Sequence, residues 1–149
     1  MGRRLTLEEL TDRFEIDELL NRYVAALDDN RFDQLSSVFT SDAHISYADA
    51  GMEGDYETVS KWLAAQRPTQ RVWLHLVGNR RVDLDGDAAS VVSTYFFVGV
   101  SPEGMTFFTG GEYHDRAVRT AGGWRIAERI EKQLWALAPT GGELPTPAS

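Results

Sequence analysis

The apolar side chains between Glu15 and Asp28 recur three or four residues apart, so they share one face of a helix. A helix with so continuous an apolar face needs a large apolar surface to cover, and the strand-forming second half of the chain can provide one. We therefore expect the fold to be organised around this helix. The predicted buried face consists of Ile16, Leu19, Leu20, Tyr23, Val24 and Leu27.

Asp28 ends this helix and breaks a local rule, because a carboxylate at a helix C-terminus meets the negative end of the helix dipole. Two interpretations stay open. Asp28 can belong to a turn, Asp28-Asp29-Asn30, in which short polar side chains bond their own backbone. It can also belong to a functional site, where such violations gather.

The same pattern analysis predicts the elements on either side of this helix. Thr6 to Glu9 matches a capping box, and the helical turns after it have an apolar stripe out of phase with the main one, so we expect a break near Thr11-Asp12. The chain beyond Asp28 then predicts a short helix at 32–39, a strand at 44–47, a loop at 48–54 and a helix at 55–66 that Asp55 caps.

From Val72 onward, β-branched and aromatic runs alternate with hairpin signals, which predicts an antiparallel meander. Gly110-Gly111 lies inside one run and indicates a bulge. Helices followed by such strands predict an α+β fold, a cone-shaped α+β barrel whose N-terminal helices pack on the concave face of a strongly curved, mostly antiparallel sheet. A hollow left between the layers is the expected ligand pocket. We expect one domain at 1–137 and a flexible Pro/Gly-rich tail at 138–149.

Composition narrows the function. With 149 residues and 42% hydrophobic content the chain can bury about two-thirds of its unfolded surface in a single core. The absence of cysteine excludes disulfides and thiolate sites, and no apolar run approaches a membrane span, so we expect a cytoplasmic protein with no membrane contact. A net charge of -8 argues against a nucleic-acid partner.

His75 is the only polar residue between Val72 and Val77, a run apolar on both faces and so expected in the centre of the sheet. A desolvated histidine needs a partner. It is either a core residue bonded to backbone, or a neutral base with one ring nitrogen free for substrate and the other oriented by a carboxylate. Asp28 is the acid that we pair with it.

Arg129 lies in a stretch that alternates from Trp124 to Trp135. Arg129 can assist a leaving group or bind an anionic oxygen, and the alternative is a surface charge pair. Strict alternation puts Trp124, Ile126, Glu128, Ile130 and Leu134 on one face and Arg125, Ala127, Arg129 and Glu131 on the other.

Further candidates for binding substrate are aromatic. The tyrosines at 23, 47, 95 and 113 can supply phenolic donors to a pocket. Tyr23 and Tyr47 rank first because one lies a turn before Asp28 and the other ends a strand, and Trp62 points inward from its helix. Tyr113 shares a strand face with Asp115, opposite His114 and Glu112, which form a second acid–base pair or a solvated edge. The three histidines show no metal-ligand spacing and the glycines no phosphate loop, so we expect no metal and no cofactor.

With these residues in place, the chain resembles the SnoaL-like group of the nuclear transport factor 2 fold over roughly 7–135. The stretches that carry the resemblance are IDELLNRYVAALDDNRFDQLSSVFTSDA at 16–43, the histidine followed by Gly78-Asn79 at 75–79, GGEYHDRAVR at 110–119 and GGWRIAER at 122–129. This fold carries lyases, isomerases, cyclases, hydrolases and non-catalytic subunits.

Within the group the pattern is nearest to scytalone dehydratase, bile-acid dehydratase and hexachlorocyclohexane dehydrochlorinase. The resemblance implies an Asp–His dyad at Asp28 and His75, a pocket arginine at Arg129 and a pocket tyrosine at Tyr47. The chain departs from these enzymes at three places: Leu27 replaces a second pocket tyrosine, Val98-Gly99 lacks a second histidine, and Tyr23 replaces a lysine.

The resulting hypothesis is a small cofactor-independent lyase of the dehydratase or dehydrohalogenase type, acting on a hydrophobic cyclic or polyketide-like molecule. An isomerase or cyclase using the same dyad, and a non-catalytic binding or assembly subunit, stay as alternatives. The resemblance also implies a homo-oligomer, dimer or trimer. The apolar runs Tyr95-Phe96-Phe97 and Phe107-Phe108 agree, since they exceed what one helical layer covers.

Overall fold

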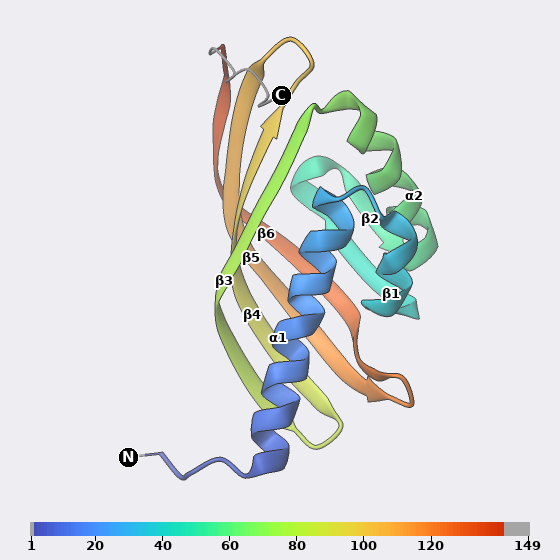
Figure 1. The fold of residues 1–149 in the computed structure, drawn as a ribbon, viewed down its shortest axis with the longest axis vertical. Coiled ribbons are helices and arrows are strands. Elements are labelled where there is room, and N and C mark those ends of the chain that lie inside the picture. The colour runs from blue at the N-terminus through green and yellow to red at the C-terminus, as the bar shows by residue number, and fades with distance from the viewer. Residues whose placement is uncertain (1, 142–149) are drawn as a thin grey trace, which may run out of the picture.

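The computed structural model describes residues 2–141, which form helices on one side of a six-stranded sheet (Figure 1). The elements are α1 (Leu7–Asp28), η1 (Phe32–Ser37), β1 (Phe39–Tyr47), η2 (Ala48–Ala50), β2 (Met52–Asp55), α2 (Tyr56–Gln66), η3 (Arg67–Thr69), β3 (Val72–Asp85), β4 (Ala88–Val100), β5 (Met105–Thr120) and β6 (Gly123–Gly141).

The helix α1 is longer than expected. The Thr6–Glu9 capping box is present, as predicted, but the expected break near Thr11-Asp12 is wrong, because α1 continues unbroken to Asp28. Asp12 does not cap a new helix: its carboxylate accepts hydrogen bonds from Arg119 and from the Trp124 indole. The out-of-phase residues Leu7, Leu10 and Phe14 stay exposed, whereas the main apolar face is buried as predicted.

Between α1 and α2, the strands are more extensive than the sequence predicted. The strand expected at 44–47 is β1 and begins at Phe39, and the segment expected as a loop at 48–54 contains the short strand β2. β2 pairs antiparallel with β1 from Asp55 to Met52. The Asp55 cap of α2 is confirmed, since its Oδ1 accepts the Thr58 backbone N–H at 2.8 Å.

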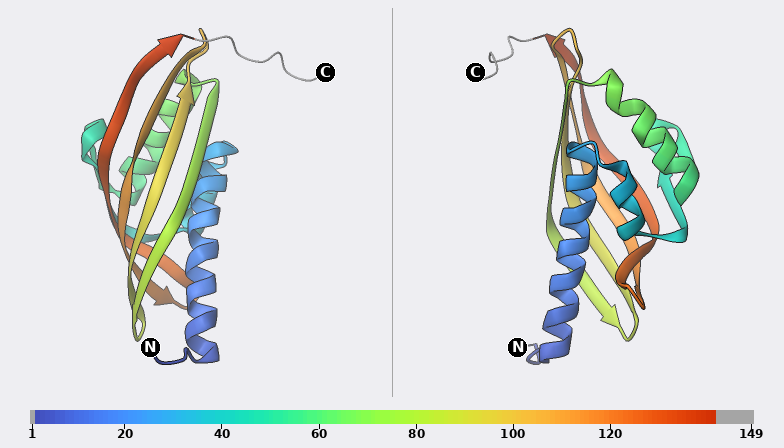
Figure 2. Two further views of the ribbon diagram at one scale, coloured as in Figure 1. Left: turned by 90° about the vertical axis from the view of Figure 1, so that its left-hand side faces the viewer. Right: turned by 45° about the vertical axis from the view of Figure 1, so that its right-hand side comes forward.

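The strand order is β2-β1-β6-β5-β4-β3, and the predicted meander from Val72 onward is confirmed. The pair of β1 and β6 is parallel, so the sheet is mixed. It bends around the helices without closing into a barrel (Figure 2). The helices cover its concave face, as expected, and the core lies between the two layers.

β3 lies at an edge of the sheet, which corrects the expectation that Val72–Val77 is central. The run is apolar on both faces for another reason. Its inward residues contribute to the interior, while Leu74 and Leu76 point outward and are 57% and 70% exposed.

Bulges decide which residues of β6 face inward. The predicted irregularity at Gly110-Gly111 is confirmed. A second one was not predicted: Ile126 pairs with Ala117 and Glu128 with Arg116, which leaves Ala127 as an extra residue. Arg129 therefore lies on the buried side with Trp124 and Ile126, and the strict alternation expected for this strand is wrong.

Residues 138–141 were expected in a flexible tail, but their backbone continues β6 and pairs with β5. The rest of that expected tail, 142–149, lies outside the described residues. Within the described chain, no helix combines the length and apolar character needed to cross a bilayer.

A first prediction concerns the bond between α1 and the sheet. Asp12 is 6% exposed, and the hydrogen bonds from Arg119 lower the pKa of its carboxyl group. A carboxyl group whose pKa is lower in the folded protein stabilises the fold at pH values above its unfolded-state pKa. This stabilisation is lost as the pH falls through the folded-state pKa. Asp12→Asn should therefore lower the free energy of unfolding by about 2 kcal/mol at pH 7 and by less in acid. Urea unfolding at several pH values measures this.

The matched control is Glu15→Gln, an exposed acid one turn along α1. Equal stability of the Asp12→Asn variant and the wild type at pH 7 would contradict the role given to this contact.

Candidate active site

The predicted dyad forms where the end of α1 meets the edge strand β3. Nδ1 of His75 lies 2.6 Å from Oδ1 of Asp28, and the backbone N–H of His75 donates to Oδ2 at 2.9 Å. Both side chains are largely buried, at 8% and 16% exposure. A carboxylate that accepts from both the ring and the backbone fixes the position and the rotation of the imidazole.

The helix end explains why Asp28 is free for this contact. Asn30 adopts the left-handed conformation with φ of 58°, and the N–H of Arg31 bonds the Ala26 carbonyl at 2.8 Å. Asn30 thus makes the turn. The geometry does not agree with the turn interpretation of Asp28, because its side chain bonds His75 of the sheet rather than its own backbone.

The contact also determines the tautomer. Since a carboxylate oxygen only accepts, Nδ1 carries the proton and Nε2 carries the lone pair. Within residues 2–141, Nε2 of His75 makes no hydrogen bond. The ring packs on Phe97, with centroids 4.5 Å apart, and meets Trp73 edge-on at 6.0 Å. His75 can therefore act as a base toward a molecule in the adjoining hollow.

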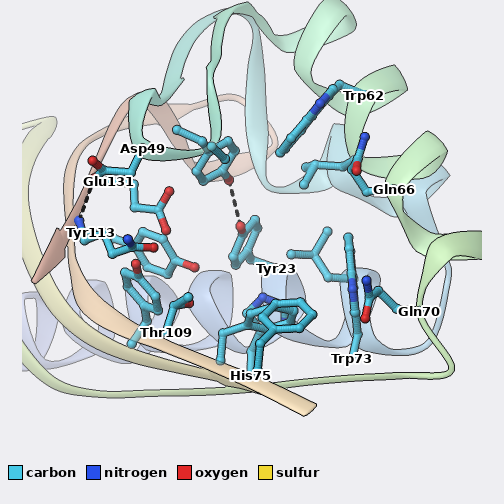
Figure 3. Close-up of a pocket in the computed structure, with 18 of the residues that line it drawn as sticks. Tyr23, Asp49, Trp62, Gln66, Gln70, Trp73, His75, Thr109, Tyr113 and Glu131 are labelled. Carbon is cyan, nitrogen blue, oxygen red and sulfur yellow. Dashed lines mark hydrogen bonds between the residues drawn. The ribbon is translucent and has the colours of Figure 1, made fainter. Parts of the chain in front are cut away.

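That hollow is a partly open pocket of about 320 Å³ between the helices and the concave face of the sheet (Figure 3). Its volume suits a small organic molecule. His75 lines it, and Asp28 stands behind the histidine. Much of the wall is aromatic, from Tyr23, Tyr47, Trp62, Trp73, Tyr95, Phe97, Phe107 and Tyr113.

The four residues expected to bind substrate all line this pocket: Tyr23, Tyr47, Trp62 and Tyr113. The hydroxyls of Tyr23 and Tyr47 are hydrogen-bonded at 2.7 Å, and Trp62 stacks on Tyr47 with centroids 6.2 Å apart. Burial raises the pKa of the hydroxyl of Tyr23, of Tyr47 and of Tyr113. All three phenols therefore stay protonated and can donate.

Arg129 is not brought to the pocket wall. It is fully buried, and its Nε and Nη2 each donate to Asp115 at 2.7 Å. The guanidinium lies 4.1 Å from the ring centroids of both Tyr23 and Tyr113. Burial acts to lower the pKa of Arg129, but Asp115 outweighs it, so the cation persists beneath the tyrosines rather than beside a ligand.

Several pocket residues were missed from the sequence. Asp49 and Glu131 bring two carboxyl groups to the wall, joined by Tyr95 and Thr109. Glu131 had a signal, because strand alternation placed it on the face of Arg129. Tyr95 was one of the four tyrosines considered as pocket phenols. Asp49 and Thr109 had no signal, since their approach depends on how η2 and β5 meet in space. The His114–Glu112 pair forms at 2.9 Å but lies outside the pocket.

The architecture defines a class, the nuclear transport factor 2-like α+β fold. The SnoaL-like domain family matches residues 8–130 of the chain. The chain belongs to this family.

Known proteins agree with the assignment. Uncharacterized protein Rv2910c of Mycobacterium tuberculosis H37Rv is 41% identical over 134 residues, which cover 88% of this chain and 91% of that protein. A hexachlorocyclohexane dehydrochlorinase (LinA) Type2 is 19% identical with a TM-score of 0.82, covering 95% and 97% of the two chains. A putative scytalone dehydratase from Novosphingobium aromaticivorans is 22% identical with a TM-score of 0.79, covering 91% of each. These two structures show likeness of fold.

A second prediction follows from the buried ion pair. Removing one charge of a fully desolvated pair leaves the other uncompensated, so Asp115→Asn should destabilise the protein by about 3–5 kcal/mol in urea unfolding. The control is Asp83→Asn, which alters an exposed acid on β3. Similar losses in the two variants would show that the Arg129–Asp115 pair does not hold this part of the core.

Proposed function

We propose that the protein is a lyase of the dehydratase or dehydrohalogenase type, with Asp28 and His75 as its acid–base dyad. The observation that carries the proposal is the 2.6 Å contact between Nδ1 of His75 and Oδ1 of Asp28, made by an imidazole that lines a pocket. The known structures of similar fold support elimination, because two of them are named as a dehydrochlorinase and a putative scytalone dehydratase.

In the proposed reaction, Nε2 of His75 removes a proton from a carbon next to an electron-withdrawing group. The electrons of that C–H bond form the new double bond, and the bond to the neighbouring hydroxyl or halide breaks. Asp28 stabilises the imidazolium that forms. Of the paired hydroxyls of Tyr23 and Tyr47, the one that accepts from the other keeps its own proton free and donates it to the departing group. His75 later returns its proton to water.

Arg129 has an indirect part in this proposal. It touches the rings of Tyr23 and Tyr113 and not the pocket, so it is a positioning residue. Its positive charge acts to lower the pKa of the hydroxyls of Tyr23 and Tyr113, against the larger effect of burial. This makes the phenols better hydrogen-bond donors to a group that gains negative charge.

The aromatic wall supports a hydrophobic cyclic substrate. Trp62, Trp73 and Phe97 offer ring faces and edges, and the volume accommodates a molecule of one or two fused rings.

A third prediction tests the dyad. The protein is incubated in D₂O with a panel of β-hydroxy ketones and chlorinated cyclohexanes, and mass spectrometry records loss of water or HCl and uptake of deuterium. For any compound that reacts, His75→Ala and Asp28→Asn should each reduce the rate by about 10²- to 10⁴-fold, the usual contribution of general acid–base catalysis. Melting temperatures should stay near that of the wild type.

The control is His114→Ala, which removes a histidine paired with a carboxylate outside the pocket and should keep full activity. Deuterium uptake without elimination would identify isomerisation or cyclisation by the same dyad. Undiminished turnover in His75→Ala would overturn the proposed function.

We also propose that the protein is a homo-oligomer that uses the outer face of its sheet. Leu76, Phe96, Gly110 and Trp135 follow one another across four paired strands. Phe96 and Trp135 lie with their ring centroids 5.5 Å apart and are 38% and 44% exposed. An apolar patch this continuous favours burial against a second copy, in a dimer or a trimer.

A fourth prediction is that Leu76→Arg shifts the protein to monomers in sedimentation velocity, because a charge in an apolar interface is not compensated. Leu76 is 70% exposed in the single chain, so the substitution should have little effect on the folding of the protein. The variant Gln34→Arg adds the same charge at an exposed position in η1 and should leave the assembly intact. A wild type that sediments as a monomer at all concentrations contradicts the proposal.

A further inference from the structure

The pocket has two chemically different ends. Figure 3 shows Asp49, Thr109 and Glu131 gathered on one side of Tyr23, and Trp62 and Trp73 on the other. The first group forms a polar end and the second an aromatic end. The dyad explains the proton transfer, and the aromatic end explains the binding of a substrate ring. Neither explains the two carboxyl groups in the pocket wall.

Tyr95 is an unsatisfied donor at the polar end. It is 2% exposed and lines the pocket, and its hydroxyl makes no hydrogen bond of normal geometry within the described chain, although Glu131 and Thr109 lie close to it. Its ring is held by stacking on Tyr113, with centroids 4.6 Å apart at 18°. A buried hydroxyl without a partner costs free energy unless a ligand supplies the bond.

Glu131, on β6, is paired in register with Tyr113 of β5, the ring on which Tyr95 stacks. It is partly buried and lines the pocket. The second acid, Asp49, is already engaged, because its Oδ2 accepts the backbone N–H of Gln133 at 3.1 Å. Asp49 is also exposed, so Glu131 is the more enclosed of the two carboxyl groups in the wall.

The surrounding charges determine which ligand suits this end. The described pocket lining contains two acids and neither lysine nor arginine. Burial raises the pKa of the Glu131 carboxyl group, and Asp49 adds to this, while Tyr95, Arg129 and His75 act in the opposite direction. Lys132, the neighbouring cation on β6, is exposed and does not line the pocket. A ligand carboxylate would find no counter-charge here.

We propose that Glu131 and Tyr95 bind an uncharged oxygen of the substrate, a carbonyl or a hydroxyl, and so select neutral oxygenated ring compounds over carboxylates. Tyr95 donates a hydrogen bond to this oxygen, and the carboxyl group of Glu131 accepts one from it where it is a hydroxyl and repels a ligand carboxylate. The apolar part of the ring lies against Trp73 and Phe97, with the carbon that loses its proton facing His75. The inference deepens the proposed function, since it rests on the same pocket being the substrate site.

A fifth prediction uses two probes of matched shape, 2-acetylnaphthalene and 2-naphthoate, whose dissociation constants are measured by calorimetry at pH 7. The wild type should bind the ketone at least about tenfold more tightly. Glu131→Gln should narrow this ratio to about threefold or less, because it removes an acid that repels the carboxylate and keeps a donor for the ketone. Glu128→Gln, an exposed acid on the same strand, should leave the ratio unchanged.

Infrared spectroscopy gives a readout independent of ligands. A carbonyl stretch from a protonated carboxylic acid should persist in the wild type to a pH above the range in which ordinary glutamates ionise, and this component should be missing in Glu131→Gln. It should persist in Glu128→Gln and in His75→Ala.

The two proposals fail separately. An unchanged ketone-to-carboxylate ratio in Glu131→Gln, or the absence of the carbonyl band from the wild type, overturns the role of Glu131 whatever the dyad does. Since binding needs no turnover, His75→Ala should retain the ratio of the wild type. A fully active His75→Ala with the ratio intact would instead overturn the lyase and leave the selectivity standing.

Discussion

The junction of α1 with the edge strand β3 is the constraint on which the candidate site depends. An edge strand presents backbone groups that no neighbouring strand satisfies. Here Asp28 accepts the N–H of His75 with one oxygen and orients the imidazole with the other. The same bond pattern therefore covers the strand edge and prepares a base, and this explains why an acid is tolerated at the unfavourable end of a helix dipole.

Local irregularities of the sheet complete the pocket. The extra residue Ala127 reverses the alternation of β6 and directs Arg129 into the core. Its guanidinium then lies against the rings of Tyr23 and Tyr113, which line the pocket. With strict alternation, Glu128 would follow Ile126 on the inner face of β6 and Arg129 would lie on the opposite face. The extra residue in β6 thus places a positive charge beside Tyr23 and Tyr113.

The sequence predicted the fold class, the buried face of α1, the meander and the partnership of Asp28 with His75, because each depends on periodicity or on a resemblance that spans most of the chain. It did not predict the continuity of α1, where the bonds to Asp12 come from residues more than a hundred positions away. Nor did it predict that β3 is an edge strand, since an apolar outer face gives the same pattern as a buried one. Pocket residues such as Asp49 and Thr109 could be identified only once the packing of the layers was known.

Burying the charge of Arg129 costs desolvation free energy, and the neighbouring tyrosines bear on why the charge is there. A desolvated ion pair rarely stabilises a fold more than apolar side chains of similar volume would. Arg129 and Asp115 satisfy each other with two hydrogen bonds, yet Nη1 of Arg129 has no partner among the described residues and faces aromatic rings instead. Cation–π contact compensates only part of that loss. The position of this charge directly behind phenols that line the pocket agrees with the effect proposed for Arg129 on those hydroxyls.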